Sequence, residues 1–442
     1  MNRPIAEMVY RAGCRFRGTN VLHYLDQLKE SQWWSEEELR AAQLEKLRSL
    51  LVHAREHSPF YREYFERHGF DCGAGSIDDI KTLPSLGRKE IVSRKEQIQN
   101  RGPGGRLVFS KTAGTTSFPF SFYRTAEWDA QHRAALMRGC SWYGVDPWMR
   151  SGHLCSVPPR VFGRAKVRFL DYLQNRFRGR RFDLAADTFE DFYRKLAGAE
   201  YLAGYSSLLY EFARFVNERY PGERLLGLKL VRATSEKIFP HYQDEARKAF
   251  GQPMRSEYGS AEAGILAFEC PAGSLHVNME HVIVEVENDE IVVTNLISHS
   301  FPFIRYRLGD YVKLKEAFAC PCGRQGLVIE DILGRVGMKV RGRGGTAFPS
   351  VAIDRIIRSF VSLGTLVAQC QVVQRVEGRL DVYIVPGRTL VSGDKARVEN
   401  FLAGLVRRSF GGAMDAEVHF VESIPRTRAK FLEFVSDLKQ ED

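Results

Sequence analysis

The stretch SEYGSAEAG, at residues 256–264, brings an aromatic ring, two glycines and two carboxylates into one short segment. Tyr258 stands directly before a glycine, and Glu262 follows it by four positions. An aromatic ring beside a glycine turn can stack on a nucleobase, and a nearby carboxylate can hold Mg²⁺ close to phosphates. The same pattern also suits a strand that ends in a plain turn. The segment therefore supports a nucleotide-binding site only if other segments of the chain have related chemistry.

Two other segments do. SKTAGTTSFPFSF at 110–122 offers small side chains, backbone N–H groups and hydroxyls that can wrap a phosphate, although no Gly-Lys-Ser/Thr follows. RYRLGD at 305–310 sets Asp310 after a glycine, where a carboxylate can accept two hydrogen bonds from a ribose diol. Alone, the first is usually a turn and the second is one more charged turn. Their order along one chain favours a nucleotide site.

Length and composition indicate a globular protein of two or three domains. The chain has 442 residues, with 44% hydrophobic and 27% charged residues, which argues against a disordered chain or a fibre. No apolar run approaches the roughly 18 residues of a membrane helix, and the basic N-terminus lacks an apolar secretory segment. Eight cysteines in a chain this long do not form a disulfide framework. A cytoplasmic protein is the expectation.

Hydrophobic periodicity predicts an α/β core followed by a small α+β domain. Helices are expected over 36–70 with a break at Ser58-Pro59, over 126–141, and over 188–219 with a break near Gly204. Strands are expected over 225–233, 282–287 and 290–296, the last two joined by an Asn288-Asp289 turn. After Gly334 we expect helices over 351–360 and 394–409 and strands over 369–376, 380–385 and 416–421. The predicted domains are 1–334 and 335–442.

A basic segment lies within the first domain. The net charge is +10, and residues 160–181 hold seven arginines and one lysine against a single acid, Asp171. This segment is either an anion- or membrane-surface patch or a solvated helix face, and we favour the solvated face. Nucleic-acid binding has little support, because no recognition motif accompanies the charge.

Four residues form a candidate metal site. Cys270 is followed by His276, and Cys320-Pro-Cys322-Gly comes later in the chain. Three thiols and one imidazole suit tetrahedral zinc, and four protein ligands make the site structural, since no position is left open for water. The alternative is two unrelated cysteine groups in a reduced interior. We favour zinc, with His281 as the substitute if His276 is not the ligand.

Taken together, the ordered motifs resemble those of the adenylate-forming enzymes. Within them, the sequence is similar to the phenylacetate–coenzyme A ligase branch and to ligase-like proteins of capsule biosynthesis clusters. The resemblance covers nearly the whole chain and rests on HAREHSPFYREYFERHGF (53–70), KTLPSLGRKEI (81–91), the Thr/Gly loop, TSEKIFP (234–240), EYGSAEAG (257–264), FPFIRYRLGD (301–310), GRVGMKVRGRGGTAFPS (334–350) and IPRTRAKFLEFV (424–435). Six or more such motifs in order are very improbable by chance.

The resemblance implies a role for each matching residue. The residues implied to bind ATP are Thr112, Gly114, Thr115 and Thr116 at the β- and γ-phosphates, Glu236, Tyr258 and Gly259 at the adenine, Asp310 at the ribose and Arg335 at ribose or phosphate. Those implied in catalysis are Lys430 at the α-phosphate and carboxylate, Glu262 as the Mg²⁺ ligand and Thr115. Arg341 and Arg343 are implied to meet the phosphates of coenzyme A.

The implied activity is ATP-dependent formation of an acyl-adenylate, with release of pyrophosphate, followed by transfer to coenzyme A while the small domain rotates. Four positions depart from the family pattern, namely Ala113, Ser117, Gly337 and Ala429. Two alternatives therefore stay open: an amine, sugar or carrier-protein acceptor in place of coenzyme A, and a non-catalytic nucleotide-binding relative. The expected partners are a small carboxylic acid and the acceptor; a homodimer is left open.

Overall fold

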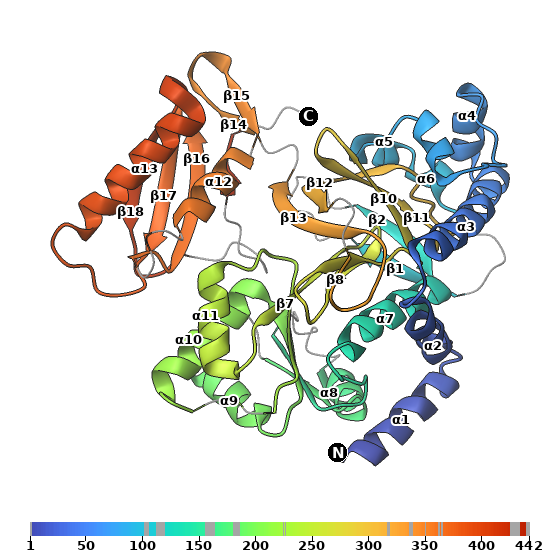
Figure 1. The fold of residues 1–442 in the computed structure, drawn as a ribbon, viewed down its shortest axis with the longest axis horizontal. Coiled ribbons are helices and arrows are strands. Elements are labelled where there is room, and N and C mark those ends of the chain that lie inside the picture. The colour runs from blue at the N-terminus through green and yellow to red at the C-terminus, as the bar shows by residue number, and fades with distance from the viewer. Residues whose placement is uncertain are drawn as a thin grey trace.

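The computed structural model describes residues 2–100, 106–111, 120–154, 164–179, 186–223, 225, 227–315, 319–335, 339–349, 351–360, 363, 366–424 and 434–438. They form a large N-terminal part around one mixed sheet and a smaller C-terminal part around a second sheet (Figure 1). This arrangement confirms the predicted fold class.

Helices open the chain, and the last of them lie beside the antiparallel strands (Figure 1). They are α1 (Arg3–Phe16), α2 (Val21–Ser31), α3 (Glu36–His57), α4 (Pro59–Arg67), α5 (Arg88–Ser93) and α6 (Lys95–Ile98), with a 3₁₀ turn at Ile77–Thr82. The predicted break at Ser58-Pro59 is confirmed, because the Ser58 hydroxyl accepts from the Tyr61 N–H and caps α4. Pro59 occupies the first helical position, where its missing N–H costs nothing.

The large sheet has eleven strands in the order β10-β11-β12-β13-β9-β8-β7-β6-β5-β3-β4. The parallel strands are β3 (Ser151–Leu154), β4 (Arg176–Arg178), β5 (Tyr201–Tyr205), β6 (Leu230–Thr234) and β7 (Met254–Ser260). The antiparallel strands are β8 (Gly264–Glu269), β9 (Leu275–Val277), β10 (Val282–Glu287), β11 (Glu290–Asn295), β12 (Tyr306–Lys315) and β13 (Val328–Arg335).

Helices between these strands complete the layers. They are α7 (Ala126–Ser141), α8 (Arg164–Leu173), α9 (Ala186–Leu196), α10 (Ser206–Arg219) and α11 (Pro240–Phe250). A separate hairpin of β1 (Leu107–Lys111) and β2 (Ser121–Thr125) precedes α7. The Asn288-Asp289 turn is confirmed, since both residues adopt the positive φ of a tight hairpin turn, 51° and 66°.

The helix expected over 188–219 is interrupted by a strand that was not expected. The expected break near Gly204 is the strand β5, which lies between α9 and α10 in the chain and pairs with β3 and β6. Its residues are almost all buried. A strand buried on both faces has no alternating pattern, so periodicity cannot separate it from a buried helix.

The arginines of the basic segment 160–181 differ in their surroundings: some pair with Asp171, and Arg168 is exposed. Arg176 and Arg178 turn back onto Asp171, with Nε–Oδ1 distances of 2.5 and 3.1 Å, so part of its charge is used within the fold. Arg168 is exposed. Arg160, Arg180 and Arg181 lie outside the described residues.

The C-terminal part matches the predicted helices and strands to within a residue or two. Its elements are β14 (Lys339–Arg341), β15 (Ala347–Pro349), α12 (Val351–Ser359), β16 (Gln369–Val376), β17 (Arg379–Val385), α13 (Asp394–Phe410), β18 (Asp415–Phe420) and β19 (Phe434–Ser436). The main sheet has the order β18-β17-β16-β19. Strand β13 ends at Arg335, one residue past the predicted boundary, and the independence of the two domains stays a prediction.

A buried ion pair ties α7 to the antiparallel strands. The guanidinium of Arg138 lies 2.7 Å from Glu280 and donates to Asn278, and both charged residues are 5% exposed. The Ser31 hydroxyl at the end of α2 also donates to Glu280. Three distant segments therefore meet at one desolvated carboxylate.

We expect Arg138→Met to lower the free energy of unfolding by about 3–5 kcal/mol, because Glu280 would stay buried without its charge partner. The measurement is urea unfolding followed by circular dichroism. Arg40→Met is the matched control: it removes an exposed pair with Glu36, which contributes less than about 0.5 kcal/mol. Equal losses in the two variants would contradict the assignment.

Candidate functional site

The turn after β7 lies at the place where open α/β sheets bind ligands. Strands β4 to β7 are parallel, and the chain then reverses into the antiparallel β8. Ligands of such sheets bind outside the carboxyl ends of the parallel strands. Residues 258–262 close β7 at that edge, next to the segment that follows β6, because Thr234 at the end of β6 pairs with Glu257.

Two glycines of EYGSAEAG are required by this reversal. A Cβ at Gly259 would lie 2.4 Å from the carbonyl oxygen of Gly264, a distance that backbone atoms cannot tolerate. Gly264 has a φ of +75°, and a Cβ there would meet the rings of His132 and Trp128 at 3.0 and 3.4 Å. The motif therefore encodes a tight strand reversal, with Glu262 in its turn.

Two of the residues that are predicted to bind the nucleotide contact each other. The Tyr258 hydroxyl donates to Asp310 Oδ2 at 2.8 Å, across 52 residues of sequence. Asp310 follows Gly309, which has a φ of +83°, and pairs in register with Arg335 of β13. The contact holds the ring and the carboxylate in a fixed mutual orientation, and it brings the two polar segments to one place.

Glu262 is 6% exposed and has a cationic neighbour that sequence reasoning missed. Arg88 Nη1, at the start of α5, lies 3.5 Å from Glu262 Oε1. The position of Arg88 is set by Leu86, whose N–H donates to the Arg305 carbonyl and whose carbonyl accepts from the Arg307 N–H. The only available signal was that Arg88 lies in KTLPSLGRKEI, a segment to which no role was attached.

Glu236 and Lys237 connect β6 with its surroundings. Glu236 Oε2 accepts from the Ser207 N–H and hydroxyl, at 2.9 and 2.5 Å, so the carboxylate caps the N-terminus of α10. Lys237 Nζ approaches the Ile332 carbonyl of β13 at 3.5 Å. TSEK thus lies between α10 and the strand that leads to Arg335.

Several predicted site residues are not placed with these. Thr112, Gly114, Thr115, Thr116 and Lys430 lie outside the described residues, as do Ala113, Ser117, Gly337 and Ala429, and of Arg335 only the backbone is described. Arg341 exchanges backbone hydrogen bonds with the Gln374 side chain, and Arg343 is ion-paired with Asp415. Both arginines belong to the C-terminal part.

Two phenylalanines that follow the Thr/Gly loop pack in the core. Phe120 and Phe122 are buried against Phe301 and Phe303, with ring centroids 5.2–6.4 Å apart. These rings fix β2 beside the FPFIRYRLGD segment. Phe118 lies outside the described residues.

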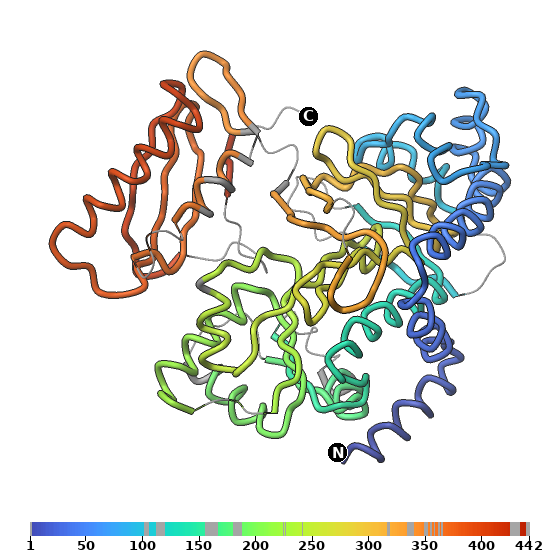
Figure 2. Tube along the Cα trace, in the orientation of Figure 1, coloured from blue at the N-terminus to red at the C-terminus, as the bar shows by residue number. Residues whose placement is uncertain are grey.

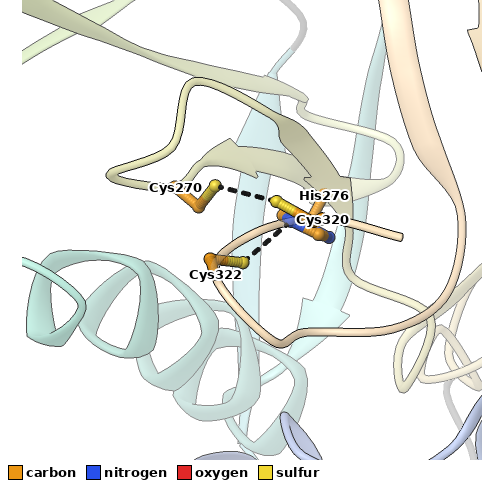
Figure 3. A group of neighbouring side chains, drawn as sticks. All are labelled: Cys270, His276, Cys320 and Cys322. Carbon is orange, nitrogen blue, oxygen red and sulfur yellow. Dashed lines mark hydrogen bonds between the residues drawn. The ribbon is translucent and has the colours of Figure 1, made fainter. Parts of the chain in front are cut away.

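The four predicted metal ligands come together. Figure 3 shows the sulfurs of Cys270, Cys320 and Cys322 gathered beside the imidazole of His276, and all four ligand atoms lie within 4.8 Å of one another. Cys270 Sγ is 3.7 Å from Cys320 Sγ, and Cys322 Sγ is 3.4 Å from His276 Nε2. His281 lies elsewhere, bonded through Nδ1 to Asn278. The group could hold a metal ion.

These distances fit a tetrahedral ion of the size of zinc. Bonds of about 2.3 Å to sulfur and 2.0–2.1 Å to nitrogen place two sulfurs roughly 3.8 Å apart and a sulfur and a nitrogen roughly 3.5 Å apart. Burial, helped by Arg324 and Arg138, lowers the pKa of His276 to about 4. The imidazole is therefore neutral at pH 7, which is the form that ligates metals.

Aromatic residues fix the loop that carries two of the cysteines. The guanidinium of Arg324 lies 4.7 Å from the Trp33 ring and 4.3 Å from the Trp142 ring. Trp142 in turn donates to Gln32 at 2.7 Å. The cluster thus joins β8, β9 and the loop before β13 to the helical layer.

Comparison with known proteins supports this architecture. No family model matches the chain. Two curated proteins are similar: Protein CapK of Staphylococcus aureus, 22% identical over 92% of this chain and 90% of that protein, and phenylacetate-coenzyme A ligase of Thermus thermophilus, 23% identical over 78% and 80%.

Solved structures of adenylate-forming ligases share the fold. A 2-hydroxyisobutyryl-CoA ligase in the postadenylation state, in complex with 2-HIB-AMP, superposes with a TM-score of 0.73 over 92% of each chain at 18% identity. An open form of the same ligase with 2-HIB-AMP and CoA gives 0.60 over 91% and 93%, at 18% identity. An ATP-bound RpMatB-BxBclM chimera gives 0.50 over 76% and 68%, at 17% identity. The chain is thus a distant homologue of CapK and of phenylacetate-coenzyme A ligase and has the fold of the adenylate-forming ligases.

Proposed function

We propose that this protein activates a carboxylic acid with ATP, forming an acyl-adenylate and pyrophosphate, and then transfers the acyl group to coenzyme A. Supporting observations are the shared fold and the structures of relatives that hold an acyl-adenylate, ATP or CoA. In this proposal residues 335–442 form a lid that carries Lys430.

The observation that carries the proposal is the contact between Tyr258 and Asp310 at the carboxyl edge of the sheet. A phenol ring and a carboxylate held in one orientation suit a nucleoside, with the ring against the base and the carboxylate at the ribose hydroxyls. Glu236, held by the N-terminus of α10, lies at the end of the neighbouring strand β6 and is assigned to the adenine.

The chemistry needs charge neutralisation more than covalent help. An oxygen of the substrate carboxylate attacks the α-phosphorus, and the bond to pyrophosphate breaks. Lys430 is assigned to neutralise charge on the α-phosphate and the carboxylate. The buried carboxylate of Glu262 is the donor type that Mg²⁺ prefers, so the residue fits a magnesium ligand and the ion would balance phosphate charge. The guanidinium of Arg88, 3.5 Å away, orients that carboxylate.

Carboxylate-dependent ATP–pyrophosphate exchange, run with pools of aryl, fatty and amino acids, tests adenylation. We expect exchange in one pool in the wild type. Lys430→Ala and Glu262→Gln should each lower the maximal rate by about 10²–10³, because each removes charge stabilisation. Asp310→Asn should mainly raise the KM for ATP, because it weakens the contact with ribose.

Asp289→Asn, in the exposed hairpin turn, is the matched control and should exchange like the wild type. If ATP binds without exchange in any pool, the non-catalytic relative is favoured. If ATP does not bind, the adenylate proposal fails.

An acceptor other than coenzyme A is the second candidate. Arg343 is already ion-paired with Asp415 in the C-terminal part, so its charge is not wholly available to a phosphate. The similarity to CapK also covers more of the chain than the similarity to the coenzyme A ligase. An amine, a sugar or a carrier-protein thiol, as in the biosynthesis of capsule polysaccharides, could then take the acyl group.

The acceptor is tested by following AMP release with the activated acid and each acceptor in turn. We expect turnover to depend on coenzyme A, and Arg341→Ala to raise the KM for coenzyme A by about tenfold, since it removes a charge-assisted contact. Arg388→Ala, which breaks a pair with Asp394 in the same part, is the control and should leave that KM unchanged. Turnover with an amine or sugar but not with coenzyme A would overturn this step.

The proposal also assigns a structural zinc ion to Cys270, His276, Cys320 and Cys322. All four positions of a tetrahedral ion are then filled by protein, so the ion stabilises the loop before β13 and takes no part in the reaction. The donor set of three thiols and one imidazole fits this ion. Burial raises the pKa of Cys270 to about 12, so that sulfur is a thiol unless a bound cation keeps it ionised.

Metal analysis of the purified protein should find about one zinc per chain. Cys322→Ser should lose most of that zinc and lower the melting temperature, because one of four ligands is missing. Cys72→Ser is the control: Cys72 is a buried free cysteine outside the cluster, so zinc content should not change. Equal zinc content in the two variants would disprove the assignment.

A further inference from the structure

Helix α1 has apolar side chains on two opposite faces. Ala6, Tyr10 and Cys14 are buried and pack against the core beside Trp148. A second stripe, at positions 5, 8, 12 and 16, faces solvent. Ile5 is 46% exposed, Met8 63% and Phe16 93%. Spacings of three and four residues put these side chains on one side of the helix, so the molecule presents an apolar stripe that its own core does not use.

Arginines border the exposed stripe. Arg11 and Arg15 are exposed and lie three and seven positions after Met8, so they flank it on the same side of the helix. Glu7 is paired with Arg11 at 2.9 Å, and Asp146 nearby is paired with Arg3 at 2.7 Å. These pairs leave Glu7 and Asp146 without net negative charge and use part of the charge of Arg3 and Arg11, while Arg15 stays outside both pairs.

Helix α8 adjoins α1 and also has exposed aromatic side chains. It contacts α1, and both helices lie at the end of the molecule far from the C-terminal part (Figures 1 and 2). Phe169 is 61% exposed and Tyr172 65%, next to the exposed Arg168. The acid of this helix, Asp171, is turned inward to Arg176 and does not offset Arg168. We call these exposed residues of α1 and α8 the α1–α8 surface.

We propose that the α1–α8 surface docks on a bilayer that contains anionic phospholipid. Exposed Phe, Met, Ile and Tyr side chains can enter the boundary between headgroups and acyl chains, while flanking arginines meet lipid phosphates. None of the described helices has the length and apolarity that a bilayer crossing needs.

Charge argues against a second copy of the chain as the occupant. A twofold interface is self-complementary, so it would set the arginines of one copy near those of the other. The chain also carries a net charge of +10, which opposes self-association and favours an anionic partner. Lipid phosphates supply the missing negative charge.

Cosedimentation of the full chain with vesicles tests the proposal. One set of vesicles is phosphatidylcholine alone, and the other is an equal mixture with phosphatidylglycerol. We expect binding to the mixed vesicles only, weakened by added salt. The double variants Met8→Ser/Phe16→Ser and Arg11→Gln/Arg15→Gln should each reduce the bound fraction at least about fivefold.

The matched control is Val376→Ser/Val391→Ser, which removes two valines that are 61% and 62% exposed in the C-terminal part. It should bind like the wild type, and unchanged melting temperatures should show that all variants fold. Equal binding to both vesicle types, or full binding by Met8→Ser/Phe16→Ser, would overturn the proposal. So would a dimer in solution that Met8→Ser/Phe16→Ser dissociates, because a second copy would then be the occupant.

Discussion

The reversal of the chain after β7 is the constraint on which the candidate site depends. Up to β7 the strands are parallel, so the loops after β5, β6 and β7 open at one edge. Within the large sheet, the strands from β8 to β13 are antiparallel, and β12 returns Asp310 to that same edge. A reversal this tight needs backbone contact, which Gly259 permits. Without it, the two halves of the sheet would not bring Tyr258 and Asp310 together.

The segment around β9 connects the large sheet to the cysteine cluster and to α7. Within five residues it provides His276 to the cysteine cluster and Glu280 to the buried pair with Arg138. One contact holds the loop before β13, and the other holds α7. Strand β13, which pairs with β9, leads toward the C-terminal part.

Local patterns predicted the C-terminal part and single elements of the large part, and long-range contacts account for what was missed. In the large sheet, only β6, β10 and β11 overlap strands that the sequence led us to expect. The Asn288-Asp289 turn and the break at Ser58 depend on a few neighbouring residues, so the sequence alone predicts them. Strand β5 is identifiable only from its partners on either side. Arg88 reaches Glu262 across 174 positions, and no spacing rule indicates such a pair. The metal cluster was predictable because a tetrahedral site needs four such ligands, and three cysteines and one histidine supply them.

The two glycines of EYGSAEAG bear on how relatives of this protein should be compared. Gly259 and Gly264 are required by backbone contact and positive φ, so any chain that folds this way needs them whether or not it has activity. Glu262 between them is not required by the turn geometry, since many residues can occupy that position. Retained glycines in a descendant therefore diagnose the architecture, whereas the identity of position 262 diagnoses whether selection still maintains the chemistry.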